Sequence, residues 1–292
     1  MKIIITGANG QLASEIKRIY DDKRSALGAI NKDFLISELI FLDKDQLDIS
    51  NEKNVEECLF SIRPNVVINC AAYTNVDGCE TNQELAFKVN SLGPKNLARM
   101  CEILGAKLIH ISSDYVYNGQ GNEPFREYDL ESPVSIYGKT KLLGDKYVQQ
   151  FSSKYFIVRT SWVYGTKGKN FVYTIINKAK ETGKLKVVND QFGSPTNAED
   201  LAYHIAKLIS SEEYGVYHCT GNNICTWYDF ACAIIKYTNI PCDISPCATG
   251  EFKTVAKRPA YSYLDNMMMR NTVGDDMRNW EDALCEFLDR IK

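Results

Sequence analysis

The sequence has few histidines, no close pair of cysteines and no long apolar run. Its three histidines are His110, His204 and His218, and its ten cysteines are scattered from Cys58 to Cys285 without a C-x-x-C pair. Neither a zinc site nor a disulfide framework is therefore indicated. No apolar run approaches the roughly 20 residues that a bilayer-spanning helix needs. Free thiols, together with a chain that starts directly in a strand rather than in a signal region, lead us to expect a cytoplasmic protein with no membrane partner.

The sequence also lacks an excess of charge of either sign. It carries 34 Lys and Arg against 37 Asp and Glu, for a net charge of −3, and no basic block of the kind that follows a phosphate backbone. We therefore expect no nucleic-acid partner. The length of 292 residues suits one large or two modest domains, each with its own core.

The first residues predict a strand, a glycine turn and a helix. Residues 2–6 are a β-branched apolar run, and Gly7 to Gly10 connect it to a helix expected over residues 11–21. The spacing is G-x-x-G-x-x-A, with Ala13 where a third glycine is usual. Unpaired N–H groups at such a helix start favour a dinucleotide pyrophosphate. The alternative is that both glycines are ordinary turn residues.

An acid follows the second expected strand, residues 39–42. At this place in a dinucleotide-binding fold, Asp43 would accept hydrogen bonds from the adenosine ribose of NAD, whereas the neighbouring Lys44 would meet the 2′-phosphate of NADP. The alternative for Asp43 is an ordinary strand-end residue.

Strands and helices then alternate, which predicts an α/β fold. A helix is expected over residues 51–63, a buried strand over 66–70, a long helix over 86–104 and a strand over 107–111. The small residues Ala71 and Ala72 would let a cofactor lie across the carboxyl edge of a parallel sheet, or they serve packing alone. Further helices are expected over residues 170–182, 198–210, 226–237 and 280–291.

Candidate catalytic groups appear at the end of the fourth strand and at the start of the next helix. Ser113 ends the strand, and Tyr137 and Lys141 stand four residues apart in a helix running to about residue 151. Residues at i and i+4 share a helix face, so an ammonium can favour a tyrosinate and lower a phenol pKa that is ordinarily about 10. Such a phenol can protonate an alkoxide that forms from a ketone, while the serine hydroxyl holds the same oxygen.

The sequence contains a second Y-x-x-x-K pair, Tyr203 and Lys207, which serves as a control. Their helix has an apolar stripe that leaves this pair facing solvent. Only Tyr137 follows a strand-end serine in the half of the chain that carries the glycine turn, so position distinguishes the two pairs.

These motifs carry a resemblance to a known family. They are TGANGQLA, LDKDQLDIS, NCAAYTNVDGCE, HISSDYVYNG, SPVSIYGKTKLLGD, RTSWVYG, QFGSPTNAEDLA and KRPAYSYLD. Through them nearly the whole chain resembles the dTDP-4-dehydrorhamnose reductase family of the extended short-chain dehydrogenase/reductase superfamily. Two residues depart from the family pattern: Ala13 replaces a glycine, and Ser113 stands where a threonine is often found.

The resemblance implies site residues of three kinds. It makes Ser113, Tyr137 and Lys141 catalytic, with Lys141 also on the nicotinamide ribose. It places the sugar nucleotide on Ser113, Asp114, Trp162 and Arg258; for Trp162 a plain core role is the alternative. The cofactor site would comprise Gly7, Gly10, Gln11, Leu12, Asp43, Asp48, Ile49, Ala71, Ala72, Thr74 and Lys141.

We therefore expect a Rossmann-type doubly wound parallel sheet with a smaller C-terminal substrate-binding lobe. Residues 1–160 would form the NAD(P)-binding domain and residues 161–292 mainly the lobe, with about 196–212 returning to the first domain. The resemblance implies reduction by NADPH or NADH of the C4 ketone of a dTDP-linked 6-deoxy-4-ketohexose, dTDP-4-dehydro-L-rhamnose, in nucleotide-sugar biosynthesis for a cell-surface polysaccharide.

Two other functions stay open at this point. One is an epimerase or dehydratase of the same superfamily, which would recycle its cofactor. The other is a non-catalytic dinucleotide-binding regulatory subunit, although all three catalytic residues are present here. Some relatives are associated with a divalent metal ion, but the sequence has no acidic cluster that requires one. It also leaves a homodimer open.

Overall fold

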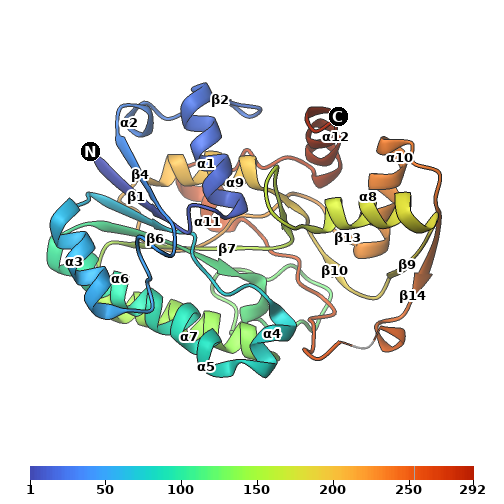
Figure 1. Ribbon diagram of the computed structural model, residues 1–292, viewed down its shortest axis with the longest axis horizontal. Helices are drawn as coiled ribbons and strands as arrows, with labels where there is room; N and C mark the ends of the chain where they lie inside the picture. Colours follow the sequence, from blue (N-terminus) through green and yellow to red (C-terminus); the bar gives the residue numbers. More distant parts are fainter. Residues whose placement is uncertain (253) are drawn as a thin grey trace.

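A six-stranded parallel sheet forms the centre of the protein (Figure 1). The computed structural model describes residues 1–252 and 254–292. The strand order is β12-β7-β6-β5-β1-β4, and every neighbouring pair is parallel. The strands are β1 (Lys2–Thr6), β4 (Glu38–Leu42), β5 (Val66–Asn69), β6 (Lys107–Ser113), β7 (Tyr155–Thr160) and β12 (Gly215–His218).

Helices cover both faces of this sheet, because its strands bury side chains on both sides. Ile3 and Ile5 of β1 pack into one core cluster and Ile4 into the other, and none of the three is exposed. The first face is covered by α1 (Gln11–Asp22), α9 (Ala198–Leu208) and α11 (Met267–Thr272), and the second by α3 (Glu52–Ile62), α6 (Gly93–Leu104) and α7 (Ile136–Phe151). This confirms the predicted doubly wound α/β fold.

A smaller lobe with its own apolar core lies beside the sheet (Figure 1). Its helices are α8 (Phe171–Thr182), α10 (Trp227–Thr238) and α12 (Trp280–Arg290), with the parallel pair β9 (Lys184–Val188) and β14 (Asp243–Cys247) at its outer side. The remaining helices and strands are short: β2 (Arg24–Ser25), β3 (Gly28–Ala29), α2 (Lys32–Leu35), α4 (Val76–Thr81), α5 (Gln83–Phe87), β8 (Val163–Tyr164), β10 (Phe192–Gly193), β11 (Thr196–Asn197) and β13 (Cys225–Thr226).

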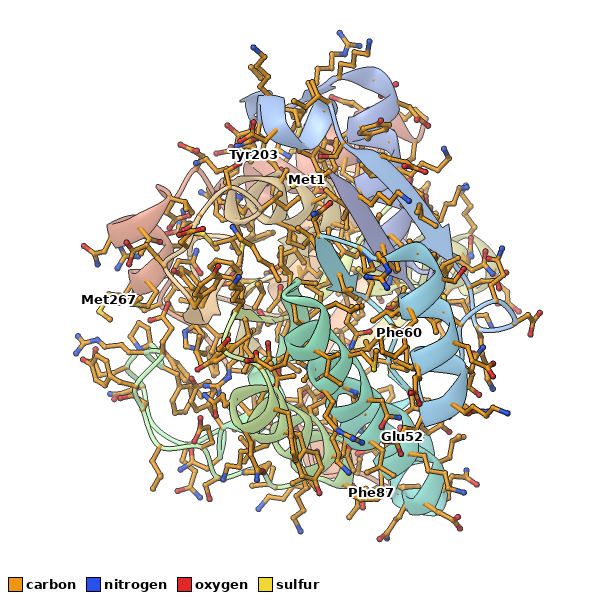
Figure 2. All side chains as sticks on the ribbon, turned by 90° about the vertical axis from the view of Figure 1, so that its left-hand side faces the viewer. Met1, Glu52, Phe60, Phe87, Tyr203 and Met267 are labelled. Carbon is orange, nitrogen blue, oxygen red and sulfur yellow. The ribbon has the colours of Figure 1, made fainter. Side chains whose placement is uncertain are left out.

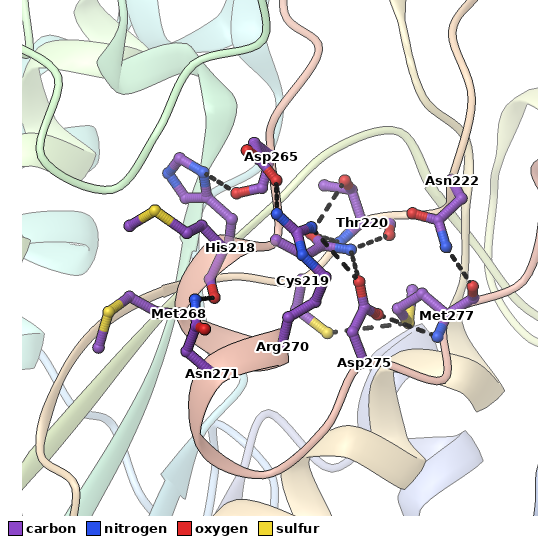
Figure 3. Close-up of polar contacts among 12 residues, drawn as sticks. His218, Cys219, Thr220, Asn222, Asp265, Met268, Arg270, Asn271, Asp275 and Met277 are labelled. Atoms are coloured by element: carbon purple, nitrogen blue, oxygen red, sulfur yellow. Dashed lines mark hydrogen bonds and ion pairs between the residues drawn. The ribbon is translucent and has the colours of Figure 1, made fainter.

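The late part of the chain returns to the sheet more than once. We expected such a return at about residues 196–212, and α9 lies there. Two later segments return as well: β12 is the edge strand of the sheet, and α11 packs on one of its faces. Polar contacts connect the end of β12 to the residues just before α11. His218 Nδ1 lies 3.1 Å from the Asp265 carbonyl oxygen (Figure 3), and Asn266 Nδ2 donates to the Thr220 carbonyl over 2.9 Å. The division into two domains stays a prediction.

The helix expected over residues 86–104 starts earlier and contains a π-helical turn at Lys88–Leu92, between α5 and α6. The buried Asn90 side chain bonds both the N–H and the carbonyl of Tyr73, and Ser91 Oγ donates to the Thr140 carbonyl. These tertiary contacts fix the wide turn, a feature often found near functional sites. None of the helices described by the structure is long and apolar enough to cross a bilayer.

Candidate functional site

The glycine turn lies where the strand order reverses. Strand β1 has β4 on one side and β5 on the other, so the chain crosses to opposite sides of β1, and such a reversal is where open α/β sheets bind ligands. Gly7 has φ +67°, and a Cβ there would lie 2.9 Å from the Ala71 backbone nitrogen. Only glycine fits this contact, which brings the turn and the end of β5 together.

A cavity of about 620 Å³ lies at this edge of the sheet, and we call it the sheet-edge cavity. It brings together ten of the predicted site residues: Gly10, Gln11, Leu12, Ala72, Thr74, Ser113, Asp114, Tyr137, Lys141 and Trp162. The start of α1 and the three candidate catalytic residues therefore share one space.

The position of Tyr137 follows from how α7 begins. Ser135 caps the helix by accepting a hydrogen bond from the Gly138 N–H over 3.1 Å. A Cβ on Gly138 would lie 2.1 Å from the Tyr115 carbonyl oxygen, so the first turn packs directly on the backbone after β6. The Tyr137 ring then meets the Tyr115 ring edge-on, with centroids 5.3 Å apart.

The electrostatics of the tyrosine and lysine differ from our expectation that the ammonium lowers the phenol pKa. Burial raises the pKa of Tyr137, and a hydrogen bond with Ser113 opposes this only in part. Burial also lowers the pKa of Lys141 to about 8, which Asp145 opposes. Lys141 Nζ donates to the Ile111 carbonyl over 2.7 Å. In this structure burial, and not the lysine, sets the direction of the shift in the phenol pKa.

Asp114 is a buried carboxyl group beside the candidate catalytic residues. Its Oδ1 accepts a hydrogen bond from Ser113 Oγ over 2.8 Å, whereas Oδ2 has no partner among the described residues. Burial raises its pKa to about 6, and the hydrogen bond from Ser113 opposes this only in part. A buried, unpaired oxygen beside Tyr137 suits a hydroxyl group of a ligand.

A second cavity of about 1010 Å³, which we call the lobe cavity, lies between α8, β9 and the Arg258 segment. Its lining mixes Phe171 with exposed lysines of α8 and β9. Arg258 lines it too, and its guanidinium pairs with Asp77 of α4 through bonds of 3.2 and 2.8 Å. The two cavities share two lining residues, Tyr115 and Trp227.

The two tryptophans near this junction stack on each other. The Trp162 and Trp227 rings are nearly parallel, with centroids 3.5 Å apart. Trp162 has φ +48°, a conformation rare for a bulky residue. Since strained backbone concentrates at functional sites, this supports a ligand-facing role for Trp162 over a plain core role.

The remaining predicted site residues lie outside the lining of both cavities. The Asp43 carboxylate caps its own loop, accepting hydrogen bonds from the N–H groups of Asp45 and Gln46, and lies 3.5 Å from Asn9 Nδ2 of the glycine turn. Asp48 accepts from Ser50, and Ile49 packs against Gly93. Of these three side chains, Asp43 is the one that contacts the glycine turn.

Sequence reasoning did not single out Tyr115, Trp227 or Asp77. Tyr115 and Asp77 stand inside the quoted motifs, so their position in those motifs was the available signal. Trp227 gave no local signal beyond an aromatic at the start of a helix. Among residues 1–252 and 254–292, no group of three or more His, Cys, Asp or Glu side chains is placed to hold a metal ion.

Comparison with known proteins assigns the whole chain to one family. Residues 1–292 match the family described as the RmlD substrate binding domain. The chain belongs to this family. A dTDP-4-dehydrorhamnose reductase of Escherichia coli is 34% identical over 302 residues, covering 100% of this chain and 98% of that protein. The spore coat polysaccharide biosynthesis protein SpsK of Bacillus subtilis is 38% identical over 287 residues, 98% and 96% of the two chains.

Solved structures of the RmlD family confirm the fold. A dTDP-4-dehydrorhamnose reductase from Clostridium acetobutylicum superposes with a TM-score of 0.94 at 47% identity, covering 100% of this chain and 99% of that one. The enzyme of the same name from Bacillus anthracis, solved in complex with NADP, gives a TM-score of 0.92 at 40% identity and covers 99% of each chain.

Proposed function

We propose that this protein is an NAD(P)H-dependent reductase that converts dTDP-4-dehydro-L-rhamnose to dTDP-L-rhamnose. The observation that carries the proposal is the sheet-edge cavity, which places Ser113, Tyr137 and Lys141 beside the glycine turn of α1. The match of the whole chain to dTDP-4-dehydrorhamnose reductases supports the substrate. We further propose that the enzyme works in the cytoplasm.

The residues at the sheet edge fit a nicotinamide dinucleotide. Gly7 and Gly10 keep side chains away from the start of α1, where unpaired N–H groups favour a pyrophosphate. Gln11, Leu12, Ala72 and Thr74 would line its path, with Lys141 at the nicotinamide ribose and Asp43 at the adenosine ribose. When bound, the reduced cofactor supplies the hydride for the substrate ketone.

The side chains have separate tasks in this proposal. Ser113 Oγ binds the C4 oxygen, and the Tyr137 hydroxyl gives its proton to that oxygen as the alkoxide forms. Since burial raises the pKa of Tyr137, the phenol keeps its proton until the alkoxide forms. The Lys141 ammonium stabilises the tyrosinate that remains.

The two cavities suit the two halves of the substrate. The sugar would occupy the sheet-edge cavity near Asp114 and Trp162, and the thymidine diphosphate would occupy the lobe cavity. Arg258 and the lysines that line that cavity provide positive charge for a diphosphate. The link between sugar and phosphate would pass between Tyr115 and Trp227, the two residues common to both linings.

The test is an assay of NADPH and NADH oxidation with dTDP-4-dehydro-L-rhamnose. We expect one cofactor to be oxidised for each sugar reduced. An epimerase or dehydratase would change the sugar without net oxidation of added cofactor, and a regulatory subunit would bind the cofactor without turnover. Either of these results contradicts the proposal.

A further inference from the structure

A buried network of charged groups lies behind Lys141, on the side away from the sheet-edge cavity. Lys141, Asp145 and Arg159 have only 2%, 1% and 0% of their surfaces exposed. Lys141 and Asp145 stand one turn apart on α7, and Arg159 lies on the neighbouring strand β7. Charged side chains are rarely buried this completely unless opposite charges accompany them.

Asp145 has few hydrogen bonds for a buried carboxylate. Its Oδ2 accepts a hydrogen bond from Arg159 Nε over 3.2 Å, and its Oδ1 has no hydrogen-bond partner among the described residues. His110 Nε2 lies 3.6 Å from this Oδ1. The amide of Asn69 donates to His110 Nδ1 over 3.0 Å, which leaves the proton on Nε2. Burial keeps the pKa of His110 well below its ordinary value, so it is a neutral group facing Asp145.

Arg159 does not depend on Asp145 alone. Its Nη1 donates to the Tyr117 hydroxyl over 2.8 Å and its Nη2 to Glu131 Oε1 over 2.7 Å. The Tyr117 hydroxyl in turn lies 2.8 Å from His218 Nε2. Glu131 therefore balances the charge of Arg159 from the far side of the network.

Lys141 has no comparable second carboxylate. Close to it are the Ile111 carbonyl and neutral His110 on β6 and Asp145 on its own helix. Tyr137 stands one turn earlier on that helix, and Arg159 on β7 is bonded to Asp145. Two further carboxyl groups lie near the start of α7. Asp114 bonds Ser113 and acts on Tyr137, and Glu80 accepts a hydrogen bond from the Ile136 N–H over 2.8 Å. Among the described residues, Asp145 is the carboxylate that favours the charged form of Lys141.

We propose that Asp145 is a positioning residue that keeps the buried Lys141 protonated, so that the ammonium can stabilise the Tyr137 oxygen during reduction. This inference rests on the catalytic pair of the proposed function. Burial raises the pKa of Asp145, but the charges of Arg159 and Lys141 favour its carboxylate form, so the attraction between Asp145 and Lys141 favours the charged form of both groups. Without Asp145, Lys141 and Arg159 would be two buried cations with only Glu131 to balance them.

The consequence is a change in pH dependence. A lysine whose pKa lies near 8 loses its charge as the pH rises through that value, and the activity that needs the ammonium is lost over the same range. Removing an opposite charge close to an ionisable group typically shifts its pKa by about 1–3 units. We therefore expect the alkaline limb of kcat/KM in Asp145→Asn to move to lower pH by roughly one unit or more.

The experiment is a pH profile of kcat/KM, from pH 5.5 to 10, for the parent, Asp145→Asn, Asp145→Glu and Glu131→Gln. Glu131→Gln is the matched control, because it removes the other carboxylate of the same network but not the one beside Lys141. We expect Asp145→Glu and Glu131→Gln to keep the parental alkaline limb. Circular dichroism and thermal unfolding establish which variants are folded, and Asp145→Ser replaces Asp145→Asn if the latter does not fold.

The outcomes separate this inference from the proposed function. A folded Asp145 variant without charge whose alkaline limb stays at the parental pH overturns the inference, as does an equal shift in Glu131→Gln. Lys141→Met tests the catalytic pair itself. If Lys141→Met retains parental turnover, the proposed function fails; if it is inactive while Asp145→Asn has a parental profile, only the role of Asp145 fails.

Discussion

The Tyr137 hydroxyl is buried beside Tyr115 and Ser113, and this burial determines what its proton can do. A phenol whose pKa is raised by burial is a weaker acid, but it stays protonated at neutral pH and can still give its proton to a developing alkoxide, which is a stronger base than a phenolate. The neighbouring Lys141 is held on the Ile111 carbonyl 2.7 Å away. At this scale, function depends on the position of one hydroxyl and one ammonium.

Tyr137→Phe should therefore lose most turnover and keep cofactor affinity, because only the proton donor is removed. The loss of a positioned acid lowers the rate by about 10²–10⁴-fold. The measurement is kcat with NADPH, together with the Kd of NADPH.

Tyr203→Phe is the control for this substitution, since Tyr203 belongs to the second Y-x-x-x-K pair. Tyr203, which is labelled in Figure 2, lies on α9. Lys207 of the same pair bonds Asp276 and the Gly274 carbonyl. We expect parental turnover from Tyr203→Phe. Turnover of Tyr137→Phe within a few-fold of the parent would exclude Tyr137 as the acid.

Cofactor preference is a second prediction at the residue scale. Asp43 disfavours a 2′-phosphate and the exposed Lys44 favours it, and exposed charges of this kind contribute roughly 1 kcal/mol or less. Both NADPH and NADH should therefore support reduction, within about a hundredfold in kcat/KM. Asp43→Ala should shift the ratio toward NADPH and Lys44→Ala toward NADH. A ratio that neither substitution changes would show that these side chains do not face the ribose.

At the scale of single elements, the turn between β1 and α1 sets the strictest requirement. Gly7 needs both a left-handed backbone and empty space, because a Cβ would lie 2.9 Å from Ala71 N and 3.0 Å from Ala71 Cα. Both atoms belong to the backbone of Ala71, which follows the end of β5 and cannot move without disturbing that strand end. The cofactor site thus depends on the packing of two strand ends.

Gly7→Ala should consequently lose both stability and cofactor affinity. The left-handed conformation alone costs about 1–2 kcal/mol for a residue with a Cβ, and the contact with Ala71 adds to this. Gly105→Ala is the matched control, since Gly105 has φ +68° but nothing within 4 Å of an added Cβ. Urea unfolding and NADPH titration are the measurements. Equal losses of stability in the two variants, with parental cofactor affinity in Gly7→Ala, would contradict this explanation.

At the scale of the whole molecule, a buried carboxylate ties α9 to two distant helices. Glu199 Oε2 forms an ion pair with Arg18 Nη2 of α1, 2.7 Å away, and accepts a hydrogen bond from Arg290 of α12. Its Oε1 accepts from the Ala26 N–H over 2.8 Å. Burial would raise the pKa of Glu199, but these hydrogen bonds and the nearby guanidinium groups outweigh burial and lower it.

Glu199→Gln should lower stability by roughly 2 kcal/mol at neutral pH, since it removes hydrogen bonds between charged groups. Because the pKa is lower in the folded state, the stabilisation is complete above the pKa of the unfolded glutamate, about 4.3. It is lost as the pH falls through the folded pKa. Thermal unfolding at pH 7 and at pH 3 should therefore show a large difference between parent and variant at pH 7 and a smaller one at pH 3.

Glu84→Gln provides the comparison for this prediction, because Glu84 forms an exposed i,i+4 pair with Lys88. Because solvent screens exposed pairs of this kind, we expect it to leave stability nearly unchanged at either pH. A Glu199→Gln deficit as large at pH 3 as at pH 7 would show that packing, and not the charge, is responsible.

Local sequence patterns were sufficient for the regular elements. The strands β1, β5 and β6 and the helices α1, α3, α7, α8, α10 and α12 lie within a few residues of their predicted bounds. These segments have apolar residues at the period of a buried strand or an amphipathic helix, and caps or glycines at their ends. The π turn at residues 88–92 had no such signal, because the tertiary contacts of Asn90 and Ser91 create it.

The sequence by itself determined the fold class, the glycine turn and the spacing of Ser113, Tyr137 and Lys141, because each depends on neighbours along the chain. Only the tertiary structure decided that Trp227 and Tyr115 line both cavities and that Asp77 pairs with Arg258. The same holds for the burial of Asp145 beside Lys141 and Arg159. Burial also reversed the expected shift of the Tyr137 pKa. Desolvation and charge pairing depend on which side chains from distant parts of the chain come into contact, and these contacts form only in the folded protein.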